Sequence, residues 1–145
     1  MKTILAAIVL TGSTMSAFAA TPLQSATIPL TGGTASPGHP LNISLASLPR
    51  GIPYVATCTI TNPNTENIIA NFKANDAGSN VNLEVNGSNI LSNSDIPAAK
   101  SVPFVARDVV VGDIRYSEPG LIITDLDTTN SLNMTNCVAN PLIIK

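Results

Sequence analysis

Two cysteines and one histidine are the residues of this chain with the most reactive side chains. Cys58 and Cys137 are the only cysteines, and His39 is the only histidine. Nucleophilic catalysis needs a base beside a nucleophile, and a closed zinc site needs four ligands, so this set is too small for zinc. His39 lies in a Gly-His-Pro stretch that is typical of an exposed loop. In an oxidising compartment the two cysteines are predicted to form a disulfide, and two free buried thiols are the alternative.

Paired carboxylates are the next groups that could do chemistry. Asp125 and Asp127 share strand parity and are followed by Asn130, an oxygen-rich pattern that can hold calcium. The calcium-loop pattern requires Gly and Glu where this chain has Asn130 and Asn136. A solvated turn is therefore the prediction, and calcium binding at Asp125 and Asp127 is left open.

A second carboxylate pair, Asp108 and Asp113, could serve as general acid and base in a hydrolase. The chain has no Trp and only two Tyr, so the aromatic residues that stack on sugars are nearly lacking. A carboxylate-dependent hydrolase is kept as the least favoured alternative.

Other catalytic and binding motifs are incomplete in this sequence. No Ser lies in a Gly-x-Ser-x-Gly elbow, and Gly32-Gly33 is not followed by the Gly-Lys-Ser of a phosphate loop. Asn42, Asn86 and Asn133 match the glycosylation pattern, which has no consequence in a bacterium. No catalytic, cofactor-binding or metal-binding residue is predicted, and we expect a protein that is not an enzyme.

The element that must position the first cysteine is 54–62, Tyr-Val-Ala-Thr-Cys-Thr-Ile-Thr-Asn. Side chains alternate across a strand, so Tyr54, Ala56, Cys58 and Ile60 share one face and the threonines share the other. Turn chemistry at 49–51 and 62–64 bounds the segment. It is predicted to be a buried strand with Cys58 pointing into the core, where an inter-sheet disulfide could form.

The N-terminus indicates an oxidising destination. Residues 1–19 combine a cationic start, an apolar run and an Ala-Phe-Ala cleavage site, which together predict a secretory signal peptide. The apolar run is too short to span a bilayer, and no later segment is long enough, so the mature chain is predicted to lack a transmembrane segment. Beyond the leader, we expect an extended N-terminal arm and linker at 20–40 and one domain at 41–145.

Charge excludes one class of partner. The formal net charge is −2, so there is no basic excess to neutralise phosphates, and nucleic-acid binding is not expected. Only 11% of the residues are charged, against about 25% in ordinary domains. A polar surface of Asn, Thr and Ser suits a periplasmic or secreted protein.

Short alternating or apolar stretches fill the rest of the chain, and Gly, Pro and Asn turns separate them. The segments predicted as strands are 21–30, 41–45, 54–62, 67–73, 81–85, 90–91, 102–111, 114–116, 121–126 and 131–139. The first can only be an edge strand or extended arm because Pro22 and Pro29 lack donors. Segments 31–40 and 92–101 are predicted as a loop or linker and as a crossing loop.

Several local connections are predicted as well. Asn86-Gly87 predicts a tight hairpin, and the short polar link 62–66 predicts a hairpin between 54–62 and 67–73. Arg107-Asp108 predicts a bend or bulge, or two strands that change sheets.

The last cysteine presents a parity conflict. Leu132 and Met134 share a parity that Cys137 does not. Either the strand bulges near Asn136, or its first half packs against a different layer.

Many short strands without a helical period indicate an all-β antiparallel sandwich or barrel, and the long-range disulfide favours a single β-sandwich. The arrangement resembles an immunoglobulin-like sandwich in architecture. The antibody signature itself is absent, because there is no Trp and no Tyr two residues before Cys137.

The predicted function is that of an exported, non-enzymatic binding or structural module of the bacterial envelope or extracellular space, with a protein or surface partner and no cofactor. The alternative is a fibre or adhesin subunit that assembles by β-strand addition through 21–30 or 141–145. Such a chain resembles donor-strand pilus subunits in size, export and single disulfide. It departs from them because its disulfide spans most of the chain.

Overall fold

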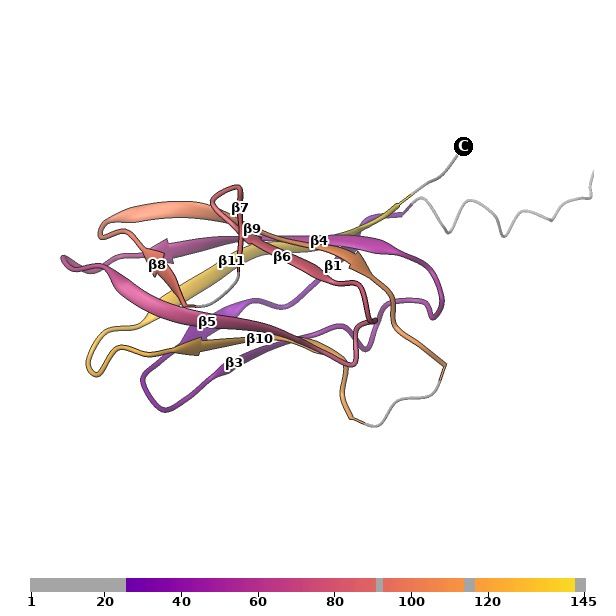
Figure 1. Cartoon of the computed structure of the whole chain (residues 1–145), viewed down its shortest axis with the longest axis horizontal. Helices are drawn as coiled ribbons and strands as arrows, with labels where there is room; N and C mark the ends of the chain where they lie inside the picture. Colours follow the sequence, from indigo (N-terminus) through magenta and orange to yellow (C-terminus); the bar gives the residue numbers. More distant parts are fainter. Residues whose placement is uncertain (1–25, 91–92, 114–116, 143–145) are drawn as a thin grey trace, which may run out of the picture.

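The computed structural model of the protein describes residues 26–90, 93–113 and 117–142. Within these ranges the regular structure is β-strand, arranged as two antiparallel sheets that pack against each other (Figure 1). The all-β antiparallel sandwich is thus confirmed. The predicted leader at 1–19 and the predicted strand at 114–116 lie outside the described ranges. None of the described residues belongs to a helix long and apolar enough to cross a membrane.

The larger sheet has seven strands, in the order β1-β11-β4-β9-β6-β7, with β2 also paired to β11. Its strands are β1 (Ile28–Pro29), β2 (Gly33–Ala35), β4 (Tyr54–Asn62), β6 (Asn82–Val85), β7 (Ser88–Asn89), β9 (Lys100–Val109) and β11 (Leu132–Pro141). The predicted central strand is β4, which lies between β11 and β9. Both of its edges are therefore occupied within this sheet.

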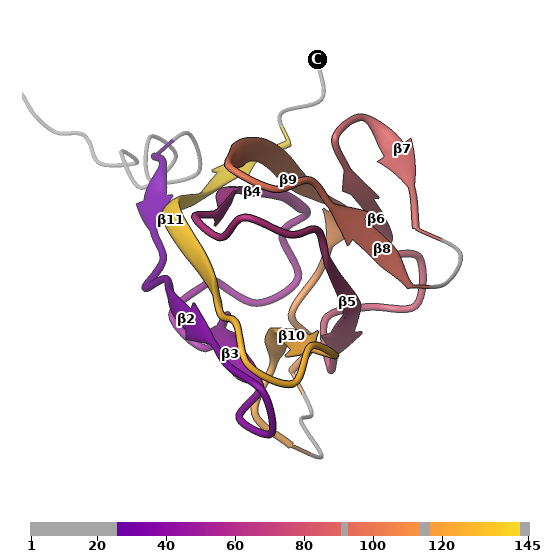
Figure 2. The same ribbon diagram turned by 90° about the vertical axis from the view of Figure 1, so that its left-hand side faces the viewer.

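The smaller sheet has four strands, in the order β3-β10-β5-β8. They are β3 (Leu41–Ser44), β5 (Ile68–Asn75), β8 (Ser94–Ile96) and β10 (Gly120–Asp125). Figure 2 shows β2 beside β3 at one border of the two layers, and β6 close to β8 at the other. The two borders bring the edges of the sheets together around one core.

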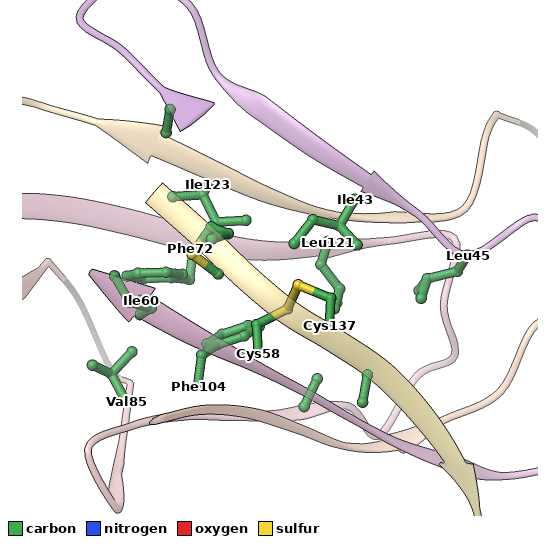
Figure 3. Close-up of a cluster of buried hydrophobic side chains, with 14 of the residues drawn as sticks. Ile43, Leu45, Cys58, Ile60, Phe72, Val85, Phe104, Leu121, Ile123 and Cys137 are labelled. Atoms are coloured by element: carbon green, nitrogen blue, oxygen red, sulfur yellow. A yellow bond between two sulfur atoms is a disulfide. The ribbon is translucent and has the colours of Figure 1, made fainter. Parts of the chain in front are cut away.

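The core lies between the inward faces of the two sheets. Strand β4 alternates as predicted, with half-exposed Val and Thr side chains on one face and buried side chains on the other, namely Tyr54, Ala56, Cys58 and Ile60. From the opposite sheet, β5 buries Phe72, whose ring stacks on Phe104 of β9 with centroids 5.2 Å apart (Figure 3). Aromatic contact between the layers adds to the burial of apolar area that holds the sandwich together.

The predicted hairpin between 54–62 and 67–73 is wrong. Strand β4 belongs to the seven-stranded sheet and β5 to the four-stranded sheet, so the link between them crosses from one layer to the other. The physical reason is that β11 and β9 occupy both edges of β4. A polar link of five residues suits a sheet crossing as well as a hairpin, and its composition does not separate the two.

The stretch 31–40, predicted as a loop or linker, contains a strand. Strand β2 pairs with Leu132–Met134 of β11, and Ala35 is fully buried. Antiparallel pairing uses main-chain groups, so a Gly-Thr-Ala strand can join a sheet without an apolar side-chain pattern. The edge strand predicted just before it is confirmed, because β1 pairs with Val138 and Ala139 of β11.

The Asn86-Gly87 hairpin is confirmed. Val85 pairs with Ser88, and the two turn residues have φ angles of 52° and 81°. Positive φ at both central residues is the requirement of the type I′ turn, which Asn-Gly meets. The chain then crosses to the smaller sheet as predicted, but 92–101 is not all loop, because Ser94–Ile96 forms β8 beside β5.

Candidate functional site

The two cysteines form a disulfide in the centre of the core. Cys58 and Cys137 are 79 residues apart in sequence, their Cα atoms are 4.2 Å apart, and they are 4% and 5% exposed (Figure 3). The predicted pairing is confirmed, but the predicted bond between sheets is wrong, because β4 and β11 are neighbours in one sheet. Strand parity shows that a side chain points inward, not which sheet carries its partner. The bond of antibody domains, by contrast, joins the two sheets.

A bulge in β11 brings Cys137 to the disulfide. Thr135 pairs with Thr59 and Val138 pairs with Thr57, so Asn136 and Cys137 together oppose Cys58. Asn136 has a φ of 53°, in the left-handed region that Asn tolerates better than most residues.

The extra residue resolves the parity conflict of this strand. Met134 and Cys137 are both buried, whereas the two residues between them are exposed. Strict alternation from Met134 would turn Cys137 towards solvent, because a one-residue shift reverses the face of every later side chain. Of the two predicted alternatives, the bulge near Asn136 is confirmed.

The N-terminal arm packs directly against this bulge. The amide of Leu30 donates to the carbonyl of Cys137 at 2.8 Å. A Cβ atom at Gly32 would collide with the carbonyl oxygen of Met134 and lie 3.5 Å from Sγ of Cys137. The close approach of the two backbones therefore requires glycine at this point of the arm.

A second bulge lies on the other side of β4. Ala106 pairs with Ala56 and Val109 with Tyr54, so Arg107 and Asp108 are both accommodated opposite one residue of β4. Asp108 has a φ of 58°. Val109 and Val111 are buried after this point, although simple alternation from Ala106 would expose them. The bulge predicted at Arg107-Asp108 is confirmed.

A cleft of about 730 Å³ opens beside this second bulge. Its lining residues are mostly small or polar: Asp76, Gly78, Ser79, Asn80, Asp108, Val110 and Gly112. The amide of Val110 donates to the carbonyl of Ala77 at 2.8 Å, which holds the β5–β6 loop against the end of β9. The cleft is therefore formed by two tied segments of the chain.

One polar group of the cleft is a buried carboxylate oxygen. Oδ2 of Asp76 is buried and has no hydrogen-bond partner among the described residues. Carboxylate and amide oxygens here suit a hydrogen-bonding ligand such as a polyol or a hydrated cation. Across 26–90, 93–113 and 117–142, no group of three or more His, Cys, Asp or Glu could hold a metal ion. Asp113, predicted as a possible partner of Asp108, offers its main-chain carbonyl to Arg50 at 3.2 Å.

One ion pair lies near the cleft. Nε of Arg107 contacts Oε2 of Glu84 at 2.8 Å, across the β6–β9 pair. The hydrogen bond that Nε of Arg107 donates to the carboxylate of Glu84 raises the pKa of Arg107. Exposed pairs of this kind contribute little to stability.

The Asp125–Asn130 turn uses its carboxylates to cap its own backbone. Oδ1 of Asp125 accepts the amide of Asp127 at 2.8 Å, and Oδ2 of Asp127 accepts the amides of Asn130 at 2.7 Å and Thr129 at 3.2 Å. The amides of Asn130 and Thr129 lower the pKa of Asp127, whereas burial raises the pKa of Asp125. Oδ2 of Asp125 has no hydrogen-bond partner within the described chain. The capping bonds therefore account for Oδ1 of Asp125 and Oδ2 of Asp127, and calcium binding at this turn stays open.

Asn62 is a structural residue that the sequence pattern marked only as a turn signal. It is fully buried, and Nδ2 donates to the carbonyls of Glu66 and Ile96, each at 2.9 Å. Oδ1 accepts from the amide of Asn64 at 3.0 Å and from its side chain at 2.8 Å. Both donor hydrogens and both lone pairs are used, so this side chain joins the end of β4 to β8 across the layers. Its inward parity, shared with Cys58, was the available signal.

The remaining sequence candidates lie at the surface. His39 is exposed, and its amide and carbonyl form a bridge with Ser36. Asn42 and Asn86 are exposed, whereas Asn133 accepts a hydrogen bond from Thr34 at 3.0 Å. These positions do not gather into one site.

The fold and the site define an all-β sandwich whose core contains one disulfide between neighbouring strands. Comparisons of the chain with protein-family models, with curated proteins and with solved structures find no match.

Proposed function

We propose that this chain is an exported, non-enzymatic β-sandwich that acts as a binding or structural module in the bacterial periplasm or outside the cell. One observation carries the proposal, namely the buried bond between Cys58 and Cys137. Disulfides persist in oxidising compartments and are rare in reducing cytosol. The predicted leader at 1–19 supports the same destination.

The uses of the polar side chains support a non-enzymatic role. Asn62 and Asp127 direct their side-chain hydrogen bonds to nearby main-chain groups, and Arg107 pairs with a strand neighbour. A general base or nucleophile must instead face a substrate. These side chains stabilise the fold, so we assign the binding role of the protein to its outer surfaces.

One outer surface suits a protein or surface partner. Ile69 and Leu126 are 47% and 43% exposed, and the amide of Leu126 donates to the carbonyl of Ile69 at 2.9 Å. They therefore lie side by side on the solvent face of the smaller sheet, where antiparallel sheets usually carry polar residues. A Ser at each position should leave stability nearly unchanged and weaken binding to such a partner.

Export is tested by expressing the full chain and a chain without residues 2–19 in a bacterium. The full chain should shorten at its N-terminus and be found in the periplasmic or culture fraction with its thiols oxidised. The truncated chain should remain in the cytoplasm with its thiols reduced. Retention of the full chain in the cytoplasm at its full mass would overturn the proposal.

A second candidate function is that of a fibre or adhesin subunit that assembles by β-strand addition. The observation that favours it is the position of β1 and β2, which are short strands from one end of the chain on an edge of the larger sheet. Light scattering of concentrated protein tests it, because chains of subunits would be expected and a uniform monomer would count against assembly.

A further inference from the structure

Within the described chain, the hydrogen bonds of the N-terminal arm, residues 27–36, go to β11 and the residue before it, apart from the turn that Ser36 forms with His39. Strands β1 and β2 both pair with β11, and the amide of Leu30 donates to Cys137 between them. The side-chain bonds of the arm also go to β11 or to the residue before it: Thr27 to Asn140, Thr34 to Asn133, and Ser131 to Ser36. Any chain that presents β11 can therefore offer the arm the same set of partners.

The edge of β11 in turn requires a strand. On its other side β11 pairs with β4, so removal of the arm would leave a row of main-chain donors and acceptors unpaired along its length. It would also uncover the site of Ala35, which is fully buried. Unpaired edges of this kind bind whichever extended chain fits them.

A short hinge, residues 36–40, connects the arm to β3. Its folded form is a turn in which Ser36 and His39 exchange main-chain hydrogen bonds of 3.2 and 2.9 Å and Gly38 has a φ of 76°. Pro37 and Gly38 occupy the two central positions of this turn, which suit the fixed φ of proline and the positive φ that glycine accepts. An arm that left its own β11 would lose the two main-chain hydrogen bonds of this turn and regain its other bonds on the β11 of a second molecule.

We propose that the arm is an exchangeable strand, and that the β11 edge of one molecule accepts the arm of a second copy of this chain. The contacts to β11 are the same in the closed and exchanged forms. The balance between them is set by the hinge and by protein concentration, as in other exchanges of identical elements. This inference deepens the second candidate function and rests on the same strand addition, but it does not depend on export.

A mixing experiment with single cysteine variants tests the exchange. Thr34 and Asn133 are cross-strand partners joined by a 3.0 Å hydrogen bond, so Thr34→Cys and Asn133→Cys place one thiol on the arm and one on β11. Equal amounts of the two variants are unfolded together with Cys58–Cys137 intact, refolded at high concentration, oxidised and analysed by mass spectrometry. In random exchange about half of the dimers contain one chain of each kind, and in these a disulfide joins the arm of one chain to β11 of the other through the two introduced thiols.

The matched control uses two strands inside the sheet. Thr61 and Ser101 are also cross-strand partners, with hydroxyl oxygens 2.9 Å apart on β4 and β9. The mixture of Thr61→Cys and Ser101→Cys should give little cross-linked heterodimer, because neither strand can leave its own molecule. Equal amounts of cross-linked heterodimer in both mixtures would overturn the proposal.

A second measurement covers the case in which the engineered thiols fail to react. Deletion of Pro37 and Gly38 shortens the hinge so that the arm cannot fold back onto its own β11. Size-exclusion chromatography with light scattering should then show dimers or longer chains, whereas a monomer with an undocked arm would contradict the exchange. Closed dimers without longer chains would support the exchange and contradict the fibre function. The two proposals can therefore be refuted independently.

Discussion

Loss of the Cys58–Cys137 bond should be the most damaging chemical change that leaves the rest of the chain intact. Reduction breaks the cross-link and keeps both sulfur atoms in the core. A double variant, Cys58→Ala with Cys137→Ala, removes the cross-link and the sulfur atoms together. Comparison of the two separates the effect of the cross-link from the effect of packing. Alanine is preferred to serine because both positions are nearly fully buried, and a hydroxyl there would need a partner.

The size of the effect follows from the chain enclosed by the bond. With a sequence separation of 79, the chain-entropy model gives at most about 4.5 kcal/mol of stabilisation from restriction of the unfolded state. For a domain of this size 1 kcal/mol corresponds to about 4 °C in Tm, so reduction should lower Tm by up to roughly 18 °C. Loss of the sulfur atoms should add about 1 kcal/mol for poorer packing in the double variant.

Calorimetry with and without reductant provides the assay. The oxidised protein should melt far above the reduced protein, and the double variant should melt slightly below the reduced protein. Reductant should not change the Tm of the double variant, which is the internal control. Equal melting of the oxidised and reduced protein would refute the view that this bond stabilises the sandwich by restricting the unfolded chain.

Substitutions at four other positions test individual parts of the structure. Asn136→Gly should stay within about 1 kcal/mol of the parent in urea unfolding, whereas Asn136→Val should lose about 2 kcal/mol, because a β-branched residue is disfavoured at positive φ; equal effects would contradict the bulge. Asn62→Ala should cost about 3 kcal/mol or more by leaving buried main-chain groups unpaired, whereas the surface control Asn82→Ala should change stability by less than about 0.5 kcal/mol. Tyr54→Phe should raise stability by about 1 kcal/mol, since the hydroxyl is buried without a partner among the described residues; a loss would reveal a hydrogen bond to it. Burial raises the pKa of Asp125, so its contribution to stability is present below the unfolded pKa and is lost as pH rises through the folded pKa. The stability of Asp125→Asn relative to the parent should therefore improve from acidic to neutral pH in paired unfolding curves, and a constant difference would argue against the buried carboxylate.

The sequence predicted those features that depend on neighbouring residues. Alternation in 54–62 placed Cys58 on the core face, and Asn86-Gly87 predicted its turn because few residue types accept positive φ at both positions. The conflict between Met134 and Cys137 gave a bulge near Asn136 as one of two alternatives, and the structure shows the bulge there. In each case the period of a strand, or the demand of a turn, is expressed within a few residues.

The features that were missed depend on distant parts of the chain. Whether 63–67 turns back or crosses between layers is decided by β9 and β11, which occupy the edges of β4. The predicted inter-sheet position of the disulfide was wrong for the same reason, because an inward side chain can meet a partner on either sheet. Strand β2 was missed because an edge strand held by main-chain hydrogen bonds needs no apolar pattern. The cleft beside Asp76 was missed because its lining comes from two segments that are far apart in sequence.

Alkylation of protein taken directly from its native compartment tests the central claim most directly, because it counts free thiols at Cys58 and Cys137. Cells are quenched in acid, the protein is unfolded with a thiol-blocking reagent, and its mass is measured before and after reduction. We predict no added label before reduction and label on both cysteines after it. Label on both cysteines before reduction would contradict the proposed role of this bond in holding the core together and the proposed location of the protein.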